Sequence, residues 1–342
     1  MRDDGSFINT FHDFTKAQQA CRALEVEHGL RRLPSAALGV GSRGLTYAEL
    51  QLQERTGREP SRRILERHVR AAAAMAVTEA DFVRHLRAEG IRVAPFYAAG
   101  GTALVVGYKV ALAGEGERFF GGGHLAKDLT LPRLRSRWGG SPEATAQAVA
   151  VWRGSGCRVG QPRRPADYEV VVHRAVSELR FMNQRLRTVP LGDVRGWADA
   201  AGELAGVLSA WSMAGGNDRD PIVQTVAVLS NLAQLRTRGR RGQSGRRLVA
   251  PHAATAARWL TSGHLRPDLT VELLGLLRLL GRAAMDYGQP RIAGQINGFA
   301  DRFGGMSRRS ETIGSWPAAR RPSAFEGQHG SRQPHSDRGP RG

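Results

Sequence analysis

The chain of 342 residues is long enough for two or three modules that each bury a core, because a typical domain takes about 100–200 residues. It carries 50 basic against 31 acidic residues, and its formal net charge of +19 favours a polyanionic partner over small metabolites alone. Its two cysteines are too few for a disulfide framework, and the sequence shows neither a signal peptide nor a long apolar run. We therefore expect a cytoplasmic protein that is not inserted in a membrane.

Helix signals dominate the first part of the chain. Apolar residues at three- and four-residue steps predict a helix from Phe11 to His28, which Gly29 ends. A second predicted helix runs from Ser61 to about Ala76. A third begins at Thr78 and stops at Gly90, and Asp81 occupies its third helical position in a capping-box arrangement.

A small sheet is predicted next. Two strands are expected at Ile91–Tyr97 and Ala103–Leu112, and the second alternates large apolar residues with smaller or polar ones. The turn Ala98–Gly101 between the two strands predicts a hairpin. A third short strand is expected near residues 118–120, so residues 39–139 are predicted to form a small α+β module.

The remaining chain is predicted to be helical, which makes the expected fold class α+β and mainly α. Residues 140–164 are rich in glycine, proline and arginine and predict a linker. Residues 165–304 show helical stripes of apolar residues and predict a bundle. Residues 305–342 are poor in apolar residues and predict a disordered basic tail. The predicted bundle helices are Tyr168–Leu186, Val194–Trp211, Pro221–Leu235, Pro251–Leu260, Leu269–Tyr287 and Pro290–Phe303.

The sequence offers no catalytic residue and no metal motif. Its ten histidines include no His-x-His or His-Glu-x-x-His spacing that would bring two imidazoles to one metal, so no cofactor is expected in this chain. Glycines 121–123 precede Lys127 without forming a phosphate loop, and a turn that leaves a strand explains them better.

Three arginine patches are the candidate DNA-binding residues. Arginine binds phosphate through charge and paired hydrogen bonds without reading the bases. Glu59 and Glu66 neutralise part of the first patch, whereas the third patch contains no acid. Aromatic residues make up 6% of the chain and fall mostly on apolar stripes, so base stacking is not expected as the main binding mode. The patches are Arg58, Arg62, Arg63, Arg67 and Arg70; Arg133, Arg135 and Arg137; and Arg236, Arg238, Arg240, Arg241, Arg246 and Arg247.

Five spaced blocks occur in order along the chain: Phe11–Leu30, Glu66–Ala73, Asp81–Gly90, Val106–Leu112 and Phe119–Trp138. Together they resemble conjugative relaxases, the mobilization nucleases of plasmids and other mobile elements, in particular the actinobacterial type. The first block is similar to the helix that closes the nuclease domain, which implies that residues 1–38 are the end of an incomplete nuclease domain. Relaxases nick one DNA strand at a transfer origin with a tyrosine nucleophile and a divalent metal held by histidines, including a His-x-His motif.

The catalytic motifs of that family have no counterpart in this sequence. In the family the metal-binding strand leads directly into a turn that resembles Arg2–Gly5, and the first tyrosine here, Tyr47, lies beyond the closing helix. The resemblance therefore implies a relaxase-derived DNA-binding protein of conjugative mobilization that does not nick DNA alone. A decayed gene, a start codon assigned too late and a split gene all fit this departure.

Two alternatives stay open. In the first, the chain is part of an active relaxase whose catalytic half is encoded upstream, and the divalent metal belongs to the complete enzyme. In the second, the chain is a helical docking protein for the conjugation machinery. The partners that the resemblance implies are DNA of the transfer-origin region, single- or double-stranded, an upstream relaxase fragment and the coupling protein of the secretion channel.

Overall fold

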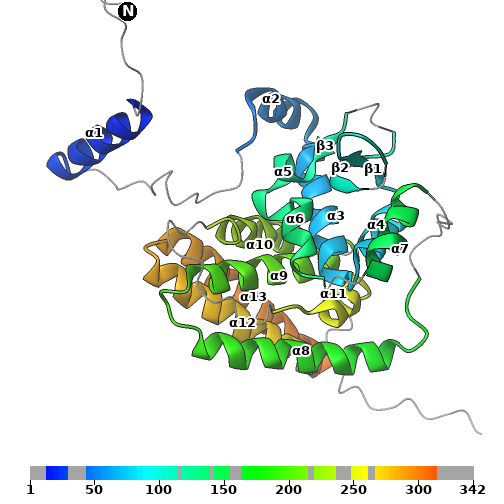
Figure 1. Ribbon diagram of the computed structural model, residues 1–342. Helices are drawn as coiled ribbons and strands as arrows, with labels where there is room; N and C mark the ends of the chain where they lie inside the picture. Colours follow the sequence, from blue (N-terminus) through cyan, green and yellow to red (C-terminus); the bar gives the residue numbers. More distant parts are fainter. Residues whose placement is uncertain are drawn as a thin grey trace, which may run out of the picture.

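The described part of the protein is mainly α-helical and contains one small antiparallel sheet, which confirms the predicted fold class. The computed structural model describes residues 13–29, 44–102, 104–114, 118–138, 142–154, 163–214, 219–235, 248–260 and 266–313. Helix α1 (Asp13–Glu27) stands apart from the other elements (Figure 1). Within the described ranges, none of the helices combines the length and the apolar character that a membrane crossing needs.

Two helices organise the small module. They are α3 (Ser61–Met75) and α4 (Glu79–Ala88), close to their predicted bounds. The capping box that begins α4 is present as predicted: the side chain of Thr78 accepts a hydrogen bond from the backbone N–H of Asp81, and the Asp81 carboxylate accepts one from the backbone N–H of Thr78. This reciprocal pair fixes where α4 starts relative to the end of α3.

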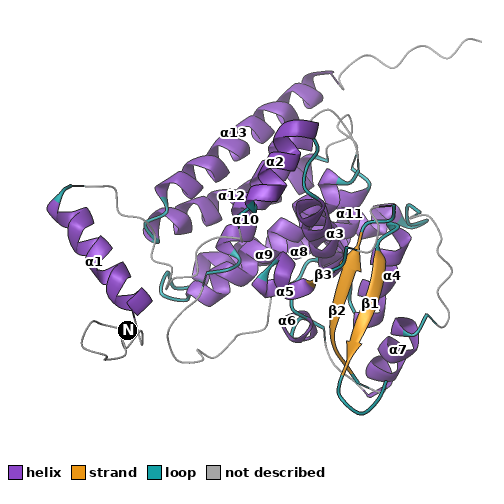
Figure 2. Ribbon diagram, turned by 90° about the horizontal axis from the view of Figure 1, so that it is seen from above, coloured by secondary structure: helices purple, strands orange, loops and turns teal. Residues whose placement is uncertain are grey.

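The sheet consists of β1 (Arg92–Tyr97), β2 (Val105–Ala111) and β3 (Phe120–Gly121), paired antiparallel in chain order. The hairpin is confirmed, and the third strand is only two residues long. The inner face of the sheet packs on the helices, where the Phe82 ring of α4 meets the Tyr108 ring edge-on at 5.3 Å between centroids. Figure 2 shows β1 and β2 at the margin of the body, next to α4.

The glycine-rich turn after β3 is structural. A Cβ atom at Gly122 would lie 2.4 Å from the carbonyl oxygen of Leu129 and 2.6 Å from the Tyr108 hydroxyl. That hydroxyl donates a 2.7 Å hydrogen bond to the same carbonyl. The chain can therefore pass beneath Tyr108 only where it has no side chain. Three short helices surround and follow this turn: α5 (Gly122–Leu125), η2 (Lys127–Leu129) and α6 (Leu131–Arg135).

A helical bundle forms the rest of the body. Its apolar stripes are buried as predicted, and Trp211 packs against Phe303 with 4.9 Å between ring centroids. Helices α9 and α10 lie side by side, α12 and α13 form a second pair, and α8 lies against α11 and α12. The bundle helices are α8 (Tyr168–Thr188), α9 (Val194–Ser212), α10 (Arg219–Leu232), α11 (Pro251–Arg258), α12 (Pro267–Asp286) and α13 (Pro290–Ile313).

Helix α3 belongs to two cores. Leu65 and Val69 face the small module, whereas Ala74 and Met75 belong to the core of the bundle. The contact with α9 is close because Gly206 has no side chain: a Cβ atom there would lie 2.5 Å from the Cβ of Ala74 and 3.0 Å from the carbonyl oxygen of residue 70. The small module and the bundle are therefore joined along a helix–helix contact.

The structure departs from the predicted organisation in three places. The predicted linker 140–164 begins with a helix, α7 (Pro142–Trp152), whose Ala148, Val151 and Trp152 are buried against the small module. Helix α2 (Tyr47–Thr56) was not expected and starts at a capping box of Thr46 and Glu49. The predicted tail 305–342 begins inside α13, which continues to residue 313, and residues 314–342 lie outside the described part of the chain.

Candidate nucleic-acid interface

Most arginines of the first predicted patch lie inside the protein. Arg62, Arg67 and Arg70 have side chains only 5%, 7% and 1% exposed. Each guanidinium is paired with carboxylates: Arg62 with Glu49 at 3.1 Å, and Arg67 with Glu59 at 2.6 Å. As a phosphate-binding surface, these three residues are a wrong prediction, because α3 lies at the centre of the protein and its charged side chains face neighbouring elements.

The Arg70 guanidinium is held from two sides. It lies 3.1 Å from Glu66, one turn earlier on α3, and 2.6 Å from Asp128 of η2. Arg63 lies 3.6 Å from Glu66 with its side chain 23% exposed, and Arg58 is exposed before α3 begins. Arg58 and Arg63 are therefore the members of this patch that reach the surface.

The ion pair of Arg62 and Glu49 makes the stability of the protein depend on pH. Burial by itself raises the pKa of Glu49, but the backbone N–H of Thr46 and the guanidinium of Arg62 more than offset this and hold its pKa below the ordinary value. The contribution of Glu49 to stability is present above the pKa of an unfolded glutamate, about 4.3, and is lost as the pH falls through the lower folded value. Glu49→Gln should therefore lower the urea midpoint at neutral pH, and the difference from the wild type should shrink in acid. Glu54→Gln, on the exposed side of α2, is the matched charge control.

The second predicted patch also contains both arginines that pair with carboxylates and an arginine that is exposed. Arg135 binds Glu79 through two hydrogen bonds of 2.6 and 2.8 Å, and Arg137 pairs with the fully buried Glu203 of α9. Arg133 is exposed on α6. Arg137 links the small module to the bundle, and its side chain is only 12% exposed, so it does not lie on the open surface that the prediction assumed. The third patch, Arg236 to Arg247, lies outside the described residues.

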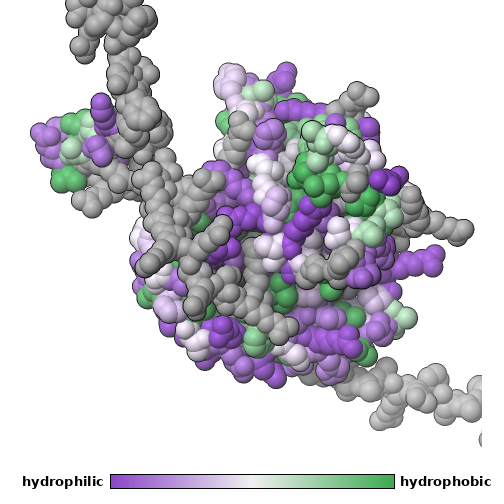
Figure 3. Space-filling model, viewed as in Figure 1, coloured by the Kyte–Doolittle hydropathy of each residue, from purple (hydrophilic) through white to green (hydrophobic). Residues whose placement is uncertain are grey.

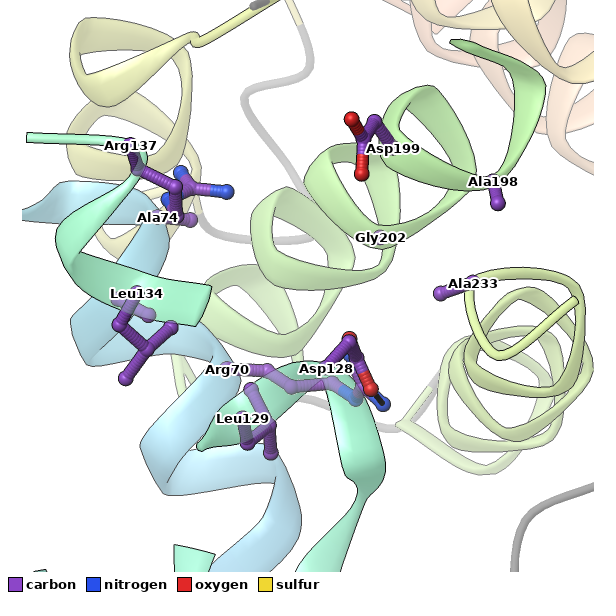
Figure 4. Close-up of a pocket in the computed structure, with 11 residues that line it drawn as sticks. Arg70, Ala74, Asp128, Leu129, Leu134, Arg137, Ala198, Asp199, Gly202 and Ala233 are labelled. Carbon is purple, nitrogen blue, oxygen red and sulfur yellow. Dashed lines mark hydrogen bonds and ion pairs between the residues drawn. The ribbon is translucent and has the colours of Figure 1, made fainter. Parts of the chain in front are cut away.

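A small pocket lies between these ion pairs. Arg70 of α3 reaches towards Asp128, with Arg137 above them and Asp199 and Gly202 of α9 opposite (Figure 4). The volume of this pocket, about 30 Å³, has room for a water molecule or two and not for a nucleotide. We attribute its charged lining to the contact between the two modules.

The outer face of the sheet carries cations beside aromatic rings. The term outer face refers here to four residues: Arg92 and Phe96 of β1, Lys109 of β2, and Phe119 just before β3. The Nζ atom of Lys109 lies 4.8 Å from the centroid of the Phe119 ring and 5.7 Å from that of Phe96. The guanidinium carbon of Arg92 lies 5.0 Å from the Phe119 centroid. One side of a three-stranded sheet therefore presents two rings and two positive charges together.

The strand register explains why these side chains share one face. Phe96 is paired with Gly107, and Ala94 with Lys109 two residues further along β2. Side chains of a strand alternate between faces, so Arg92 and Phe96 point away from the helices that cover the inner face. Phe96 is 47% exposed. Figure 3 shows hydrophobic and hydrophilic side chains next to each other on the surface over β1 and β2.

Sequence reasoning missed this face because it assigned the aromatic residues to apolar stripes. The available signal was the period of two within the correctly predicted strands, which places Arg92 and Phe96 on the side opposite Val93 and Tyr97. The two rings come from segments more than twenty positions apart, so their meeting depends on the strand pairing.

The described residues contain no group of three histidine, cysteine or acidic side chains that could hold a metal ion. The chain matches no protein-family model, no curated protein and no solved structure.

Proposed function

We propose that this chain is a relaxase-derived DNA-binding protein that contacts DNA through the outer face of its small sheet. The observation that carries the proposal is the grouping of Arg92 and Lys109 beside two aromatic rings on a solvent-facing sheet. Arg62 and Arg70 are buried in the protein. Arg92, in contrast, is exposed at the surface, where a phosphate can reach it.

The charge of the whole chain supports the same proposal. A net charge of +19 creates a positive potential that attracts a polyanion and speeds its association. The acid-free arginine segment 236–247 would then add phosphate contacts of its own. The place of this binding in conjugative mobilization, with a coupling protein as partner, rests on the resemblance of the sequence to relaxases.

A charge-reversal experiment tests the proposal. Arg92→Glu with Lys109→Glu should weaken binding of the full chain to labelled DNA by about tenfold or more, and should reduce the slope of log affinity against log salt by about one for each phosphate that is no longer bound. Fluorescence anisotropy between about 50 and 200 mM salt measures both quantities. Arg278→Glu with Arg282→Glu, two exposed positions of α12, makes the same change in net charge and is the matched control.

The α12 control distinguishes DNA binding at the sheet from general electrostatic attraction by the net charge of the chain. We expect the α12 variant to bind within about threefold of the wild type, because charges beyond a Debye length of about 10 Å are screened. An equal loss in both variants would overturn the sheet as the interface, and no binding at low salt would overturn DNA binding altogether. Cleavage of supercoiled DNA in the presence of magnesium, only after an upstream relaxase fragment is added, would favour the alternative in which the chain is part of an active relaxase.

A further inference from the structure

We infer that the outer face of the sheet is a stacking site for unpaired bases of single-stranded DNA, with Phe96 and Phe119 as the two platforms. This inference rests on the proposed function, since it specifies which form of DNA the face binds. It also reverses the expectation, drawn from composition, that base stacking is not the main binding mode.

The arrangement of the two rings is the first argument. One ammonium group, that of Lys109, lies within 6 Å of both ring centroids. Lys109 is on the middle strand of the sheet, whereas Phe96 is on β1 and Phe119 directly precedes β3. A cation between two stacking platforms is placed to bind the phosphate that joins two successive nucleotides. Aromatic side chains on the open face of an antiparallel sheet stack bases in this way in known single-strand binders.

The pose of Phe96 is the second argument. Gly107 lies opposite it on β2, and a Cβ atom there would come within 3.4 Å of Cδ2 and 3.7 Å of Cβ of Phe96. The side chain of Phe96 therefore rests against the bare backbone of the neighbouring strand, while almost half of its surface stays open to solvent. A ring supported from beneath loses little conformational freedom when a base stacks on it.

The cations are held next to the rings before DNA arrives. A positive charge over an aromatic face at an exposed site is weakly attracted by the electrons of the ring. This attraction keeps Lys109 and Arg92 near the rings and remains weak enough for a phosphate to draw them away. The inner face of the sheet is unavailable, because Tyr108 and Val110 are buried there.

The geometry favours single strands over duplex DNA. In a duplex each base face is already stacked on its neighbours, so a flat ring on a sheet has no base face to cover. A single strand exposes base faces and can lie along the sheet. Stacking tolerates any sequence because every base has a π-face, so we expect little dependence on sequence.

The test compares two forms of DNA with ring variants of the full chain. Phe96→Leu with Phe119→Leu keeps apolar side chains on the sheet but removes the aromatic faces. We expect this variant to bind labelled oligo-dT about tenfold to a hundredfold more weakly than the wild type. Its salt slope and its affinity for a duplex of equal length should stay unchanged, because the phosphate contacts are kept. Val106→Ala, also exposed on β2, should bind oligo-dT as the wild type does.

The outcomes separate this inference from the proposed function. If the leucine variant binds oligo-dT normally while Arg92→Glu with Lys109→Glu weakens it, the stacking site is overturned and DNA binding by the sheet stands. If neither variant changes binding, both are overturned. Tighter binding of oligo-U than of oligo-dT would overturn the assignment to DNA.

Ultraviolet crosslinking of a bromouracil-substituted oligonucleotide, followed by mass spectrometry, locates the site directly. The crosslink should fall in a peptide that contains Phe96 or Phe119, and a crosslink confined to other peptides would overturn the site.

Discussion

Arg70→Met is expected to cost about 3–5 kcal/mol of unfolding free energy. The substitution removes one cation from a buried cluster and leaves the carboxylates of Glu66 and Asp128 facing each other across the space of the guanidinium. Uncompensated charge inside a protein is far more costly than the net gain from making the pair. Urea unfolding followed by circular dichroism measures the change.

The matched control is Arg84→Met. Arg84 pairs with Asp81 at 2.9 Å, but both side chains are more than a third exposed, and such pairs contribute about 1 kcal/mol or less. Equal losses for the two variants would contradict the account of Arg70 as an internal residue. DNA affinity is a second measurement. Arg70→Met should bind DNA as the wild type does at a temperature where the variant is folded. A specific loss of affinity would mean that Arg70 takes part in DNA binding.

Gly206→Ala should destabilise the protein by about 1–3 kcal/mol, and Gly206→Leu by more. The added methyl group would overlap Ala74 at 2.5 Å, so α3 and α9 would have to move apart. Because the carbonyl oxygen of residue 70 also lies 3.0 Å away, the obstacle includes backbone that cannot rotate aside. Thermal and urea unfolding of the two variants test the size and the order of these losses.

Gly294→Ala is the control, and it is expected to raise the stability of the protein instead of lowering it. Gly294 lies in α13, and nothing stands within 4 Å of the place its Cβ would occupy. Alanine there should stabilise the helix by about 0.5–1 kcal/mol, since glycine loses more backbone entropy on folding. A loss of stability at both positions would mean that the tight α3–α9 contact is not what distinguishes Gly206.

Helices and strands with a clear hydrophobic period could be predicted from the sequence. The stripes of α8 and α9 and the alternation of β2 each follow from local spacing, and all three lie near their predicted bounds. Helix α7 was missed because the glycines, prolines and arginines around it were given more weight than its buried Ala148, Val151 and Trp152. Its burial depends on α4, which supplies the surface that α7 covers.

The interface could be predicted less well than the fold. A run of arginines on one helix was interpreted as a surface patch, since the sequence shows only local partners such as Glu66. The other carboxylates come from separate elements: Glu49 pairs with Arg62, Asp128 with Arg70 and Glu203 with Arg137. These pairs form only when the helices pack together, so the sequence alone does not show them. The ring pair of the outer face was hidden for the same reason, because it forms only when β1, β2 and β3 take their register.

The double membership of α3 has a consequence for how such a protein can change over evolutionary time. A small module moved into another chain without α9 would expose Ala71, Ala74 and Met75, which are buried here in the core of the bundle. A bundle without α3 would in turn lose the surface on which Gly206 packs. Neither module can therefore be transferred to another protein by itself. Recombination that fuses one of them to an unrelated domain must transfer the other as well.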